Sequence, residues 1–189
     1  GTIMSLDKSI IWTREQYEDF FQSLTRKLLP KFNKKNIRPA YQNVGGYTAK
    51  NVINQQYDDG MSGFSNKDDF IYIKVQFKPG DESYVDDNDA VYMQRFIDVT
   101  YTIYGENSPT IALTLFSLLR TSVILMELEK AGLFFYGTNN VESARETING
   151  QWWERNDFTF TVNECIKVEN PNIPQLAKDI DVEVLVLNE

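Results

Sequence analysis

Hydrophobic positions recur at helical spacing in the first well-patterned segment of the chain. Between residues 13 and 29 they lie three or four positions apart, at Tyr17, Phe20, Phe21, Leu24 and Leu28. Thr13 and Gln16 have the spacing of a capping box, and Pro30 cannot continue a helix. The pattern therefore predicts a helix over residues 13–29.

A second helix is predicted over residues 109–131. Ser108 and Pro109 are typical of a helix start, and Gly132 is typical of a helix end. The apolar positions form two stripes on a helical wheel. The stripe expected to face a sheet consists of Ile111, Ala112, Leu115, Phe116, Leu119, Val123 and Met126. The other consists of Leu113, Ile124 and Leu128, and it should meet either the N-terminal helix or another subunit.

Apolar and polar residues alternate in several other segments, which predicts strands. Residues 70–77 and 91–104 form one such pair, and the charged segment 79–90 between them, which contains Gly80, predicts the turn of an antiparallel hairpin. Further strands are predicted at residues 133–136, 151–168 and 180–187. In the long run, Phe158, Phe160 and Val162 alternate with polar residues, which indicates one buried face.

The order helix, hairpin, helix and strands predicts an α+β fold, with two principal helices packed on a mainly antiparallel sheet. The 189 residues suffice for one core, so we expect a single domain over residues 1–189. The polar, glycine-containing stretch 43–67 is predicted to be a long loop or arm. Residues 111–126 are the longest apolar stretch, but Arg120 and several hydroxyl residues interrupt them. We therefore expect a soluble protein that does not span a membrane.

The composition excludes several kinds of chemistry. The chain has no histidine, and Cys165 is its only cysteine. A disulfide within the chain, a zinc site built on cysteine and histidine, and a nucleophile paired with histidine are all excluded. No cofactor or metal is expected, and the chain is predicted not to be an enzyme.

An acidic segment is the first place to look for a metal site, because calcium prefers clustered carboxylates. It contains Asp81, Glu82, Asp86, Asp87 and Asp89. Counted from Asp86 or Asp87, it lacks the glycine at the sixth position and the glutamate at the twelfth that an EF-hand loop requires. We interpret it as a solvated hairpin tip, with contact to a weakly bound cation or a basic partner as the alternative.

A basic segment, Lys31, Lys34, Lys35 and Arg38, lies among aromatic residues, a mixture that can suit nucleic acid. The formal net charge of −8 opposes binding to a phosphate backbone. A solvated helix exit, or attachment to an acidic loop of a neighbouring subunit, is the favoured interpretation. An acidic wall also suits a channel through which DNA slides, so DNA is expected only as passing cargo.

Adjacent tryptophans, Trp152 and Trp153, are the most unusual feature of the predicted strand 151–168. In a strand they point to opposite faces, so both faces should be covered locally, and aromatic residues are enriched where subunits meet. The alternative is that one tryptophan is half exposed. Glu154 and Asp157 also point to opposite faces, so they cannot flank one bond as a catalytic pair unless a bulge intervenes. An enzyme that uses carboxylates or a bound metal is the distant alternative, and it would require both residues to converge with the acidic segment. Arg155 and Asp157 share a face and are predicted to form a structural ion pair.

Three segments occur in an order that carries a family resemblance. Phe96–Gly105 is followed by Glu106, Asn107 and Ser108. The second segment comprises Gly150, Gln151, Trp152, Trp153, Glu154 and Arg155, with Asp157 and Phe158, and the third is Val162, Asn163 and Glu164. Together they resemble the phage neck and tail terminator family. Asn156 departs from the family pattern, which has an apolar residue there, and residues 43–67 have no counterpart in it.

The resemblance implies a structural virion protein. Such a subunit would form a ring of six copies at the head-facing end of a phage-type tail, stop growth of the tail tube and join the tail to the connector. Its implied partners are its own copies, the tail tube protein, and the connector or sheath. Its implied location is a virion or phage-tail-like particle assembled in the bacterial cytoplasm. A different connector, stopper or sheath-associated component is the alternative.

A ring requires two different patches that meet, because each subunit contacts its neighbours head to tail. The sequence offers two patches of opposite charge. We therefore expect the basic residues of segment 31–38 and the acidic residues of segment 81–89 to belong to subunit contacts.

Overall fold

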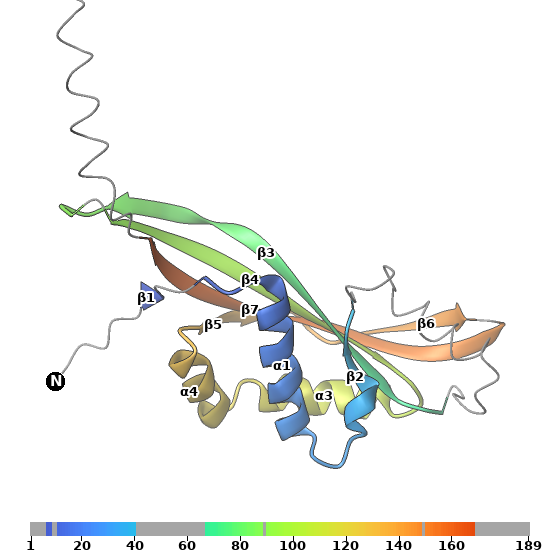
Figure 1. The fold of residues 1–189 in the computed structure, drawn as a ribbon. Coiled ribbons are helices and arrows are strands. Elements are labelled where there is room, and N and C mark those ends of the chain that lie inside the picture. Colours follow the sequence, from blue (N-terminus) through green and yellow to red (C-terminus); the bar gives the residue numbers. More distant parts are fainter. Residues whose placement is uncertain (1–6, 9–10, 41–66, 89, 149, 169–189) are drawn as a thin grey trace, which may run out of the picture.

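The structure is a computed structural model that describes residues 7–8, 11–40, 67–88, 90–148 and 150–168 (Figure 1). Its helical elements are α1 (Arg14–Leu28), the short 3-10 helix η1 (Lys34–Asn36), α3 (Ser108–Leu118) and α4 (Ser122–Lys130). Its strands are β1 (Asp7–Lys8), β2 (Ile37–Pro39), β3 (Phe70–Val85), β4 (Val91–Tyr104), β5 (Phe134–Thr138), β6 (Glu142–Ile148) and β7 (Gln151–Val168).

The strands form one mixed, mainly antiparallel sheet. Its order is β1-β7-β4-β3-β2, and β6, β5 and β1 pair one after another with the edge of β7 that lies opposite β4. The long pairings β3 with β4 and β4 with β7 are antiparallel, whereas the short β1 and β2 pair in parallel with their neighbours. The α+β fold with helices packed on a mainly antiparallel sheet is therefore confirmed.

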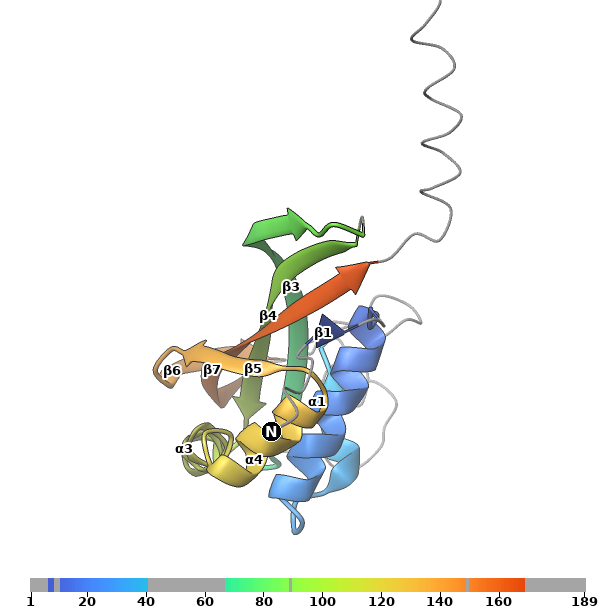
Figure 2. The ribbon, with the colours of Figure 1, turned by 90° about the vertical axis from the view of Figure 1, so that its left-hand side faces the viewer.

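The helices cover one face of the sheet, and the opposite face of β3, β4 and β7 carries no helix among the described elements (Figures 1 and 2). The predicted first helix is confirmed as α1. Its capping box is complete, because Gln16 N donates to Thr13 Oγ1 at 3.2 Å and Thr13 N donates to Gln16 Oε1 at 2.8 Å. The main core joins α1, α3 and α4 to the inward positions of β3, β4 and β7, among them Tyr17, Phe21, Ile73, Val99, Leu115, Phe158 and Phe160.

The predicted single helix over residues 109–131 is wrong. The helix ends at Leu118, and α4 starts again after Thr121, whose extended backbone (φ −72°, ψ 149°) resets the helical phase. The axes of α3 and α4 differ by 67°. No single described helix is long and apolar enough to cross a membrane, and α3 with α4 meets that criterion only as a bent pair.

The break also reassigns the two predicted stripes. Ile124 and Leu128, expected on the second stripe, are buried in the main core, whereas Val123 and Met126, expected to face the sheet, are exposed. Leu113 is exposed as well, so it does not pack on α1. The positions before the break, such as Ala112 and Leu115, face the sheet as predicted.

The β3–β4 hairpin forms, but its turn is shorter than predicted. Pairing continues past a bulge between Pro79 and Ser83 to Val85, so the turn occupies only the residues after Val85. Gly80 lies within the strand and not in a turn. A Cβ atom there would come within 2.2 Å of the Gln94 carbonyl oxygen, so glycine permits close approach of the two backbones.

The C-terminal half of the fold is centred on β7, which has the bounds predicted for it. The strand expected at 133–136 is present as β5, which starts one residue later and ends two residues later. The sequence analysis missed β6, because Glu142–Ile148 is mostly polar and exposed and lacks alternating apolar residues. The expected strand 180–187 and the expected arm 43–67, apart from Lys67, lie outside the described residues.

Candidate functional site

Trp152 and Trp153 lie at the start of β7, directly after the turn that joins it to β6. Gly150 in this turn has a φ of 75°, a conformation that favours glycine. The two indoles point to opposite faces, as predicted, but their environments differ: Trp153 is fully buried, whereas Trp152 is 65% exposed. Within a single chain only one tryptophan is covered, in agreement with the alternative interpretation. Cover for Trp152 from another subunit stays a prediction.

Trp153 belongs to a second hydrophobic cluster, on the sheet face opposite to the helices. The cluster contains Phe70, Tyr72, Tyr104, Ile148 and Trp153. The ring centroids of Phe70 and Trp153 lie 6.3 Å apart, and those of Tyr72 and Tyr104 lie 6.0 Å apart. Burial raises the pKa of Tyr72 to about 12, and its hydroxyl has no hydrogen-bond partner among the described residues. The sequence analysis missed this cluster, although β3 carries aromatic residues at 70 and 72, on the face opposite to Ile71 and Ile73.

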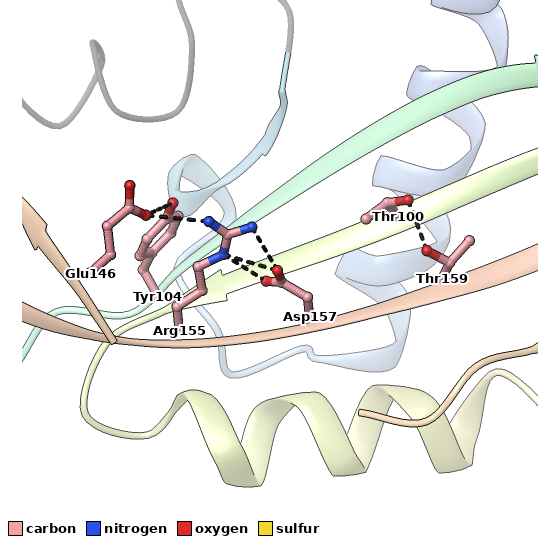
Figure 3. Close-up of polar contacts among 6 residues, drawn as sticks. All are labelled: Thr100, Tyr104, Glu146, Arg155, Asp157 and Thr159. Carbon is pink, nitrogen blue, oxygen red and sulfur yellow. Dashed lines mark hydrogen bonds and ion pairs between the residues drawn. The ribbon is translucent and has the colours of Figure 1, made fainter. Parts of the chain in front are cut away.

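An ion-pair network adjoins the second cluster (Figure 3). Arg155 donates through Nη2 to Asp157 Oδ2 at 2.7 Å, and its Nη1 lies 3.3 Å from Glu146 Oε2. The Tyr104 hydroxyl donates to the same Glu146 oxygen at 2.9 Å. The hydrogen bond to Asp157 raises the pKa of Arg155, and burial raises the pKa of Tyr104. The predicted structural ion pair between Arg155 and Asp157 is confirmed, and Glu146 of β6 links Arg155 of β7 to Tyr104 of β4.

Glu154 points to the other face of β7 and pairs with Arg145 of β6, with Nε 2.8 Å from Oε1. It therefore does not converge with Asp157. The described residues also contain no group of three or more histidine, cysteine, aspartate or glutamate side chains placed to hold a metal ion.

Asn156, the departure from the family pattern, is buried between two serines. Its amide nitrogen donates to Ser108 Oγ at 2.9 Å, and its carbonyl oxygen accepts from Ser143 Oγ. The polar side chain is thus satisfied, and it connects the start of α3 to β6 through β7. These two hydrogen bonds explain how a polar residue is accommodated at a buried position of β7.

A buried charge pair lies toward the other end of β7. Glu164 is fully buried, accepts from Arg95 Nε at 2.5 Å and also accepts a hydrogen bond from the Tyr17 hydroxyl of α1. The Arg95 guanidinium also lies 4.1 Å from the centre of the Phe77 ring. The sequence analysis noted Glu164 only through the family resemblance. Its position could have been a signal, because Glu164 continues the buried series Phe158, Phe160 and Val162.

Nearly all of these features lie within the part of the chain that matches a known protein family. A sequence model of the family described as phage neck terminator protein matches residues 16–188, from the first turn of α1 to beyond the end of β7. The chain belongs to the phage neck terminator family. It is therefore a structural protein of the bacteriophage tail and neck, and its family is associated with other components of the particle. No curated protein is significantly similar to the chain in sequence.

The basic patch of this neck terminator, defined by Lys31, Lys34, Lys35 and Arg38, lies between the end of α1 and β2. The three lysines are exposed. Arg38 is half buried and donates through Nε to the Lys35 carbonyl at 2.7 Å, so it partly serves the local turn. The three lysines are thus available to another molecule.

The acidic hairpin tip of the neck terminator lies at the far end of β3. Asp86 forms the turn itself, because its Oδ1 accepts from the amides of Asn88 and Ala90 at 2.9 and 3.0 Å. The hydrogen bond from the Ala90 amide, followed by that from Asn88, lowers the pKa of Asp86. Asp87 is exposed, whereas the side chains of Asp81 and Glu82 and all of Asp89 lie outside the described residues.

The structure does not bring the two charged patches together within one chain. Arg38 pairs with Tyr72 near the start of β3, and the acidic tip follows Val85 at its end. At ~3.3 Å per strand residue, roughly 40 Å separate them. A head-to-tail contact between copies joins two different parts of the surface, so each patch would contact a different part of a neighbouring copy.

Proposed function

We propose that the chain forms a ring of six copies that caps the head-facing end of a phage-type tail. The ring stops growth of the tail tube and offers its outer surface to the connector, or to the sheath. The family match over residues 16–188 carries this proposal. Assembly in the bacterial cytoplasm and passage of DNA through the ring belong to the same proposal.

The distribution of charge supports contacts between copies. Lys31, Lys34 and Lys35 are exposed on one part of the surface, and Asp87 is exposed at the distant hairpin tip. The net charge of −8 suits a wall along which DNA slides without sticking. Trp152, a large exposed aromatic residue, is of the kind that anchors protein interfaces.

The test is charge reversal in the basic patch. The double variant Lys34→Glu, Lys35→Glu should reduce the fraction of chain that assembles at tube ends, because it replaces attraction between copies by repulsion. Assembly is measured by light scattering after size-exclusion chromatography, with and without purified tail tubes. Electron microscopy counts the capped ends.

A matched control reverses two exposed charges elsewhere. Arg120→Glu with Lys130→Glu makes the same charge change at the end of α3 and on α4. We expect this control to assemble like the wild type. If the Lys34, Lys35 variant keeps the wild-type oligomer mass and caps tubes normally, the basic patch is not a subunit contact.

A further inference from the structure

The first half of α1 carries a buried glutamate with one carboxylate oxygen that accepts no hydrogen bond from the described residues. Glu18 is 7% exposed, and its Oε1 is buried with no hydrogen-bond partner among the described residues. Arg14, one turn earlier, places Nε 3.8 Å from this oxygen, which is longer than a hydrogen bond, and its own side chain is half exposed. A carboxylate removed from water without a hydrogen-bonded partner lowers the stability of the folded chain.

Glu18 lines an open pocket of about 340 Å3 at the start of α1. The other lining residues are Thr13, Arg14, Glu15 and Phe77. One helical turn after Glu18, Gln22 donates to the Ile37 carbonyl of β2 at 2.7 Å. Because β2 ends two residues after Ile37, it does not extend to Phe77. The pocket therefore lies beyond the end of the β2–β3 pairing, on the side of Phe77.

The chemistry of the pocket suits a cation. Burial raises the pKa of Glu18, Arg14 lowers it, and the charges of Asp19 and Glu15 raise it. A second positive charge beside Glu18 would relieve both the missing hydrogen bond and the repulsion from Glu15. Two carboxylates next to a guanidinium are too few oxygen ligands for a calcium ion, which takes six to eight. A lysine ammonium needs only one or two acceptors and donates up to three hydrogen bonds.

The same chain carries exposed lysines at the opposite end of α1. Lys31, Lys34 and Lys35 are exposed and follow the end of the helix. The 15 residues of α1 span roughly 22 Å at 1.5 Å per residue, farther than a lysine side chain extends. These lysines therefore cannot reach the pocket of their own chain, but those of a neighbouring copy can.

We propose that a neighbouring copy of the chain inserts a lysine of its basic patch, residues 31–38, into the Glu18 pocket. Each copy then offers the pocket at one end of α1 and the lysines at the other, so the contact is head to tail and repeats around a ring. The inference rests on the ring assembly proposed above and names the surface that receives the basic patch. The buried Glu18 carboxylate gains its missing hydrogen bond only when the neighbouring copy is bound.

The first test compares Glu18→Gln with Glu129→Gln, an exposed glutamate of α4. In the isolated chain, Glu18→Gln should raise the melting temperature by about 2–4 °C, because it removes a buried charge. In the presence of tube ends it should weaken ring assembly about 10-fold or more, measured as the concentration at which half of the ends are capped. The Glu129→Gln control should change neither quantity. A residue needed only for folding would not combine higher stability with weaker assembly.

The second test asks whether the pocket and the lysines meet across subunits. In a Cys165→Ser background, Glu15→Cys, which lines the pocket and leaves Glu18 in place, is combined in one chain with Lys31→Cys, which leaves Lys34 and Lys35 in place. Mild oxidation or a short bifunctional thiol reagent should then link copies into a covalent ladder that ends at a closed ring. A control pair, Glu129→Cys with the same lysine substitution, should give no ladder.

The outcomes separate this inference from the proposed function. If the wild type caps tubes as a ring and Glu18→Gln caps them equally well, or if no ladder forms, the pocket does not receive a neighbour's lysine. If Glu18→Gln forms rings that fail to bind tube ends, the cation comes from the tube subunit and the inference is overturned. If the wild type itself forms no ring at tube ends, both the inference and the proposed function are overturned.

Discussion

Two buried glutamates at the first half of α1 have opposite surroundings: Glu18 belongs to the helix, and Glu164 of β7 contacts the helix through Tyr17. Glu164 of β7 accepts hydrogen bonds from Arg95 and from Tyr17 of α1, so its charge is matched inside the chain. Glu18, the next residue after Tyr17, has a buried oxygen that accepts no hydrogen bond from the described residues, and it lines an open pocket. The first arrangement stabilises the fold. The second costs stability in the single chain and is suited to contact with another molecule.

The two faces of β7 show the same division of roles near Trp152 and Trp153. The buried Trp153 packs in a cluster within the chain, and the exposed Trp152 contributes its indole to the surface. One member of each pair is thus buried with partners inside the fold, and we propose that the other takes part in assembly. Substitutions can test this division, because stability and assembly are measured separately.

Removal of Arg95 should have the largest effect. Arg95→Ala leaves Glu164 buried without its cation, and breaking a buried ion pair from one side costs about 3–5 kcal/mol. Urea denaturation of the isolated chain measures this loss as a change in the free energy of unfolding. The double variant Arg95→Met, Glu164→Leu removes both charges and should lose less. A loss below about 1 kcal/mol for Arg95→Ala would show that Tyr17 alone satisfies Glu164.

The second largest effect on the free energy of unfolding should come from Trp153→Ala, and Trp152→Ala should have a much smaller one. Trp153→Ala opens a cavity in the second cluster and should lower the free energy of unfolding by about 3 kcal/mol. Trp152→Ala should change it by less than about 0.5 kcal/mol, because the side chain is mostly exposed. In capping assays, however, Trp152→Ala should weaken assembly. Equal losses of folding stability for both variants would remove the distinction between the two faces.

Glu18→Gln should have a smaller effect, of opposite sign. Removing the buried charge should raise the free energy of unfolding of the isolated chain by about 1 kcal/mol. Urea denaturation of the wild type and the variant at neutral pH measures the difference. If the variant is less stable than the wild type, Glu18 is satisfied within the chain and resembles Glu164.

The smallest expected effect is the pH dependence of the difference in the free energy of unfolding between the wild type and Glu18→Gln. Burial raises the pKa of Glu18 in the folded chain above its unfolded value. The folded state therefore binds the proton more tightly, and its advantage is lost as the pH rises through the folded pKa. The extra stability of Glu18→Gln should vanish below about pH 4 and be complete near pH 7. Denaturation midpoints across this range check it, and a difference independent of pH would contradict it.

Much of the fold follows from local pattern. The capping box at Thr13, the alternation along residues 151–168 and the start of α3 at Ser108 are each decided by residues near in sequence, and each lies where it was predicted. The ion pair of Arg155 with Asp157 was predictable for the same reason, because side chains two residues apart in a strand point to the same face of the sheet.

Other features depend on partners that are distant in sequence. The break between α3 and α4 has no proline or glycine to announce it, and it places Ile124 and Leu128 on the core. Glycine is a residue type typical of turns, but the pairing of β3 with β4 places Gly80 against Gln94, within the bulge between Pro79 and Ser83. A polar strand such as β6 forms because β7 supplies its hydrogen bonds, and not because of its own pattern.

The sequence by itself determined the fold class, the main helix and strand positions and the family, because these depend on short-range periodicity and on motifs that are continuous in the chain. Only the tertiary structure decided which glutamate is fully hydrogen-bonded. Glu164 meets Arg95 and Tyr17 across 69 and 147 residues of sequence, whereas Oε1 of Glu18 accepts no hydrogen bond among the described residues and has only Arg14 at 3.8 Å. Burial and charge pairing are properties of neighbours in space, which the order of residues along a strand or helix does not specify.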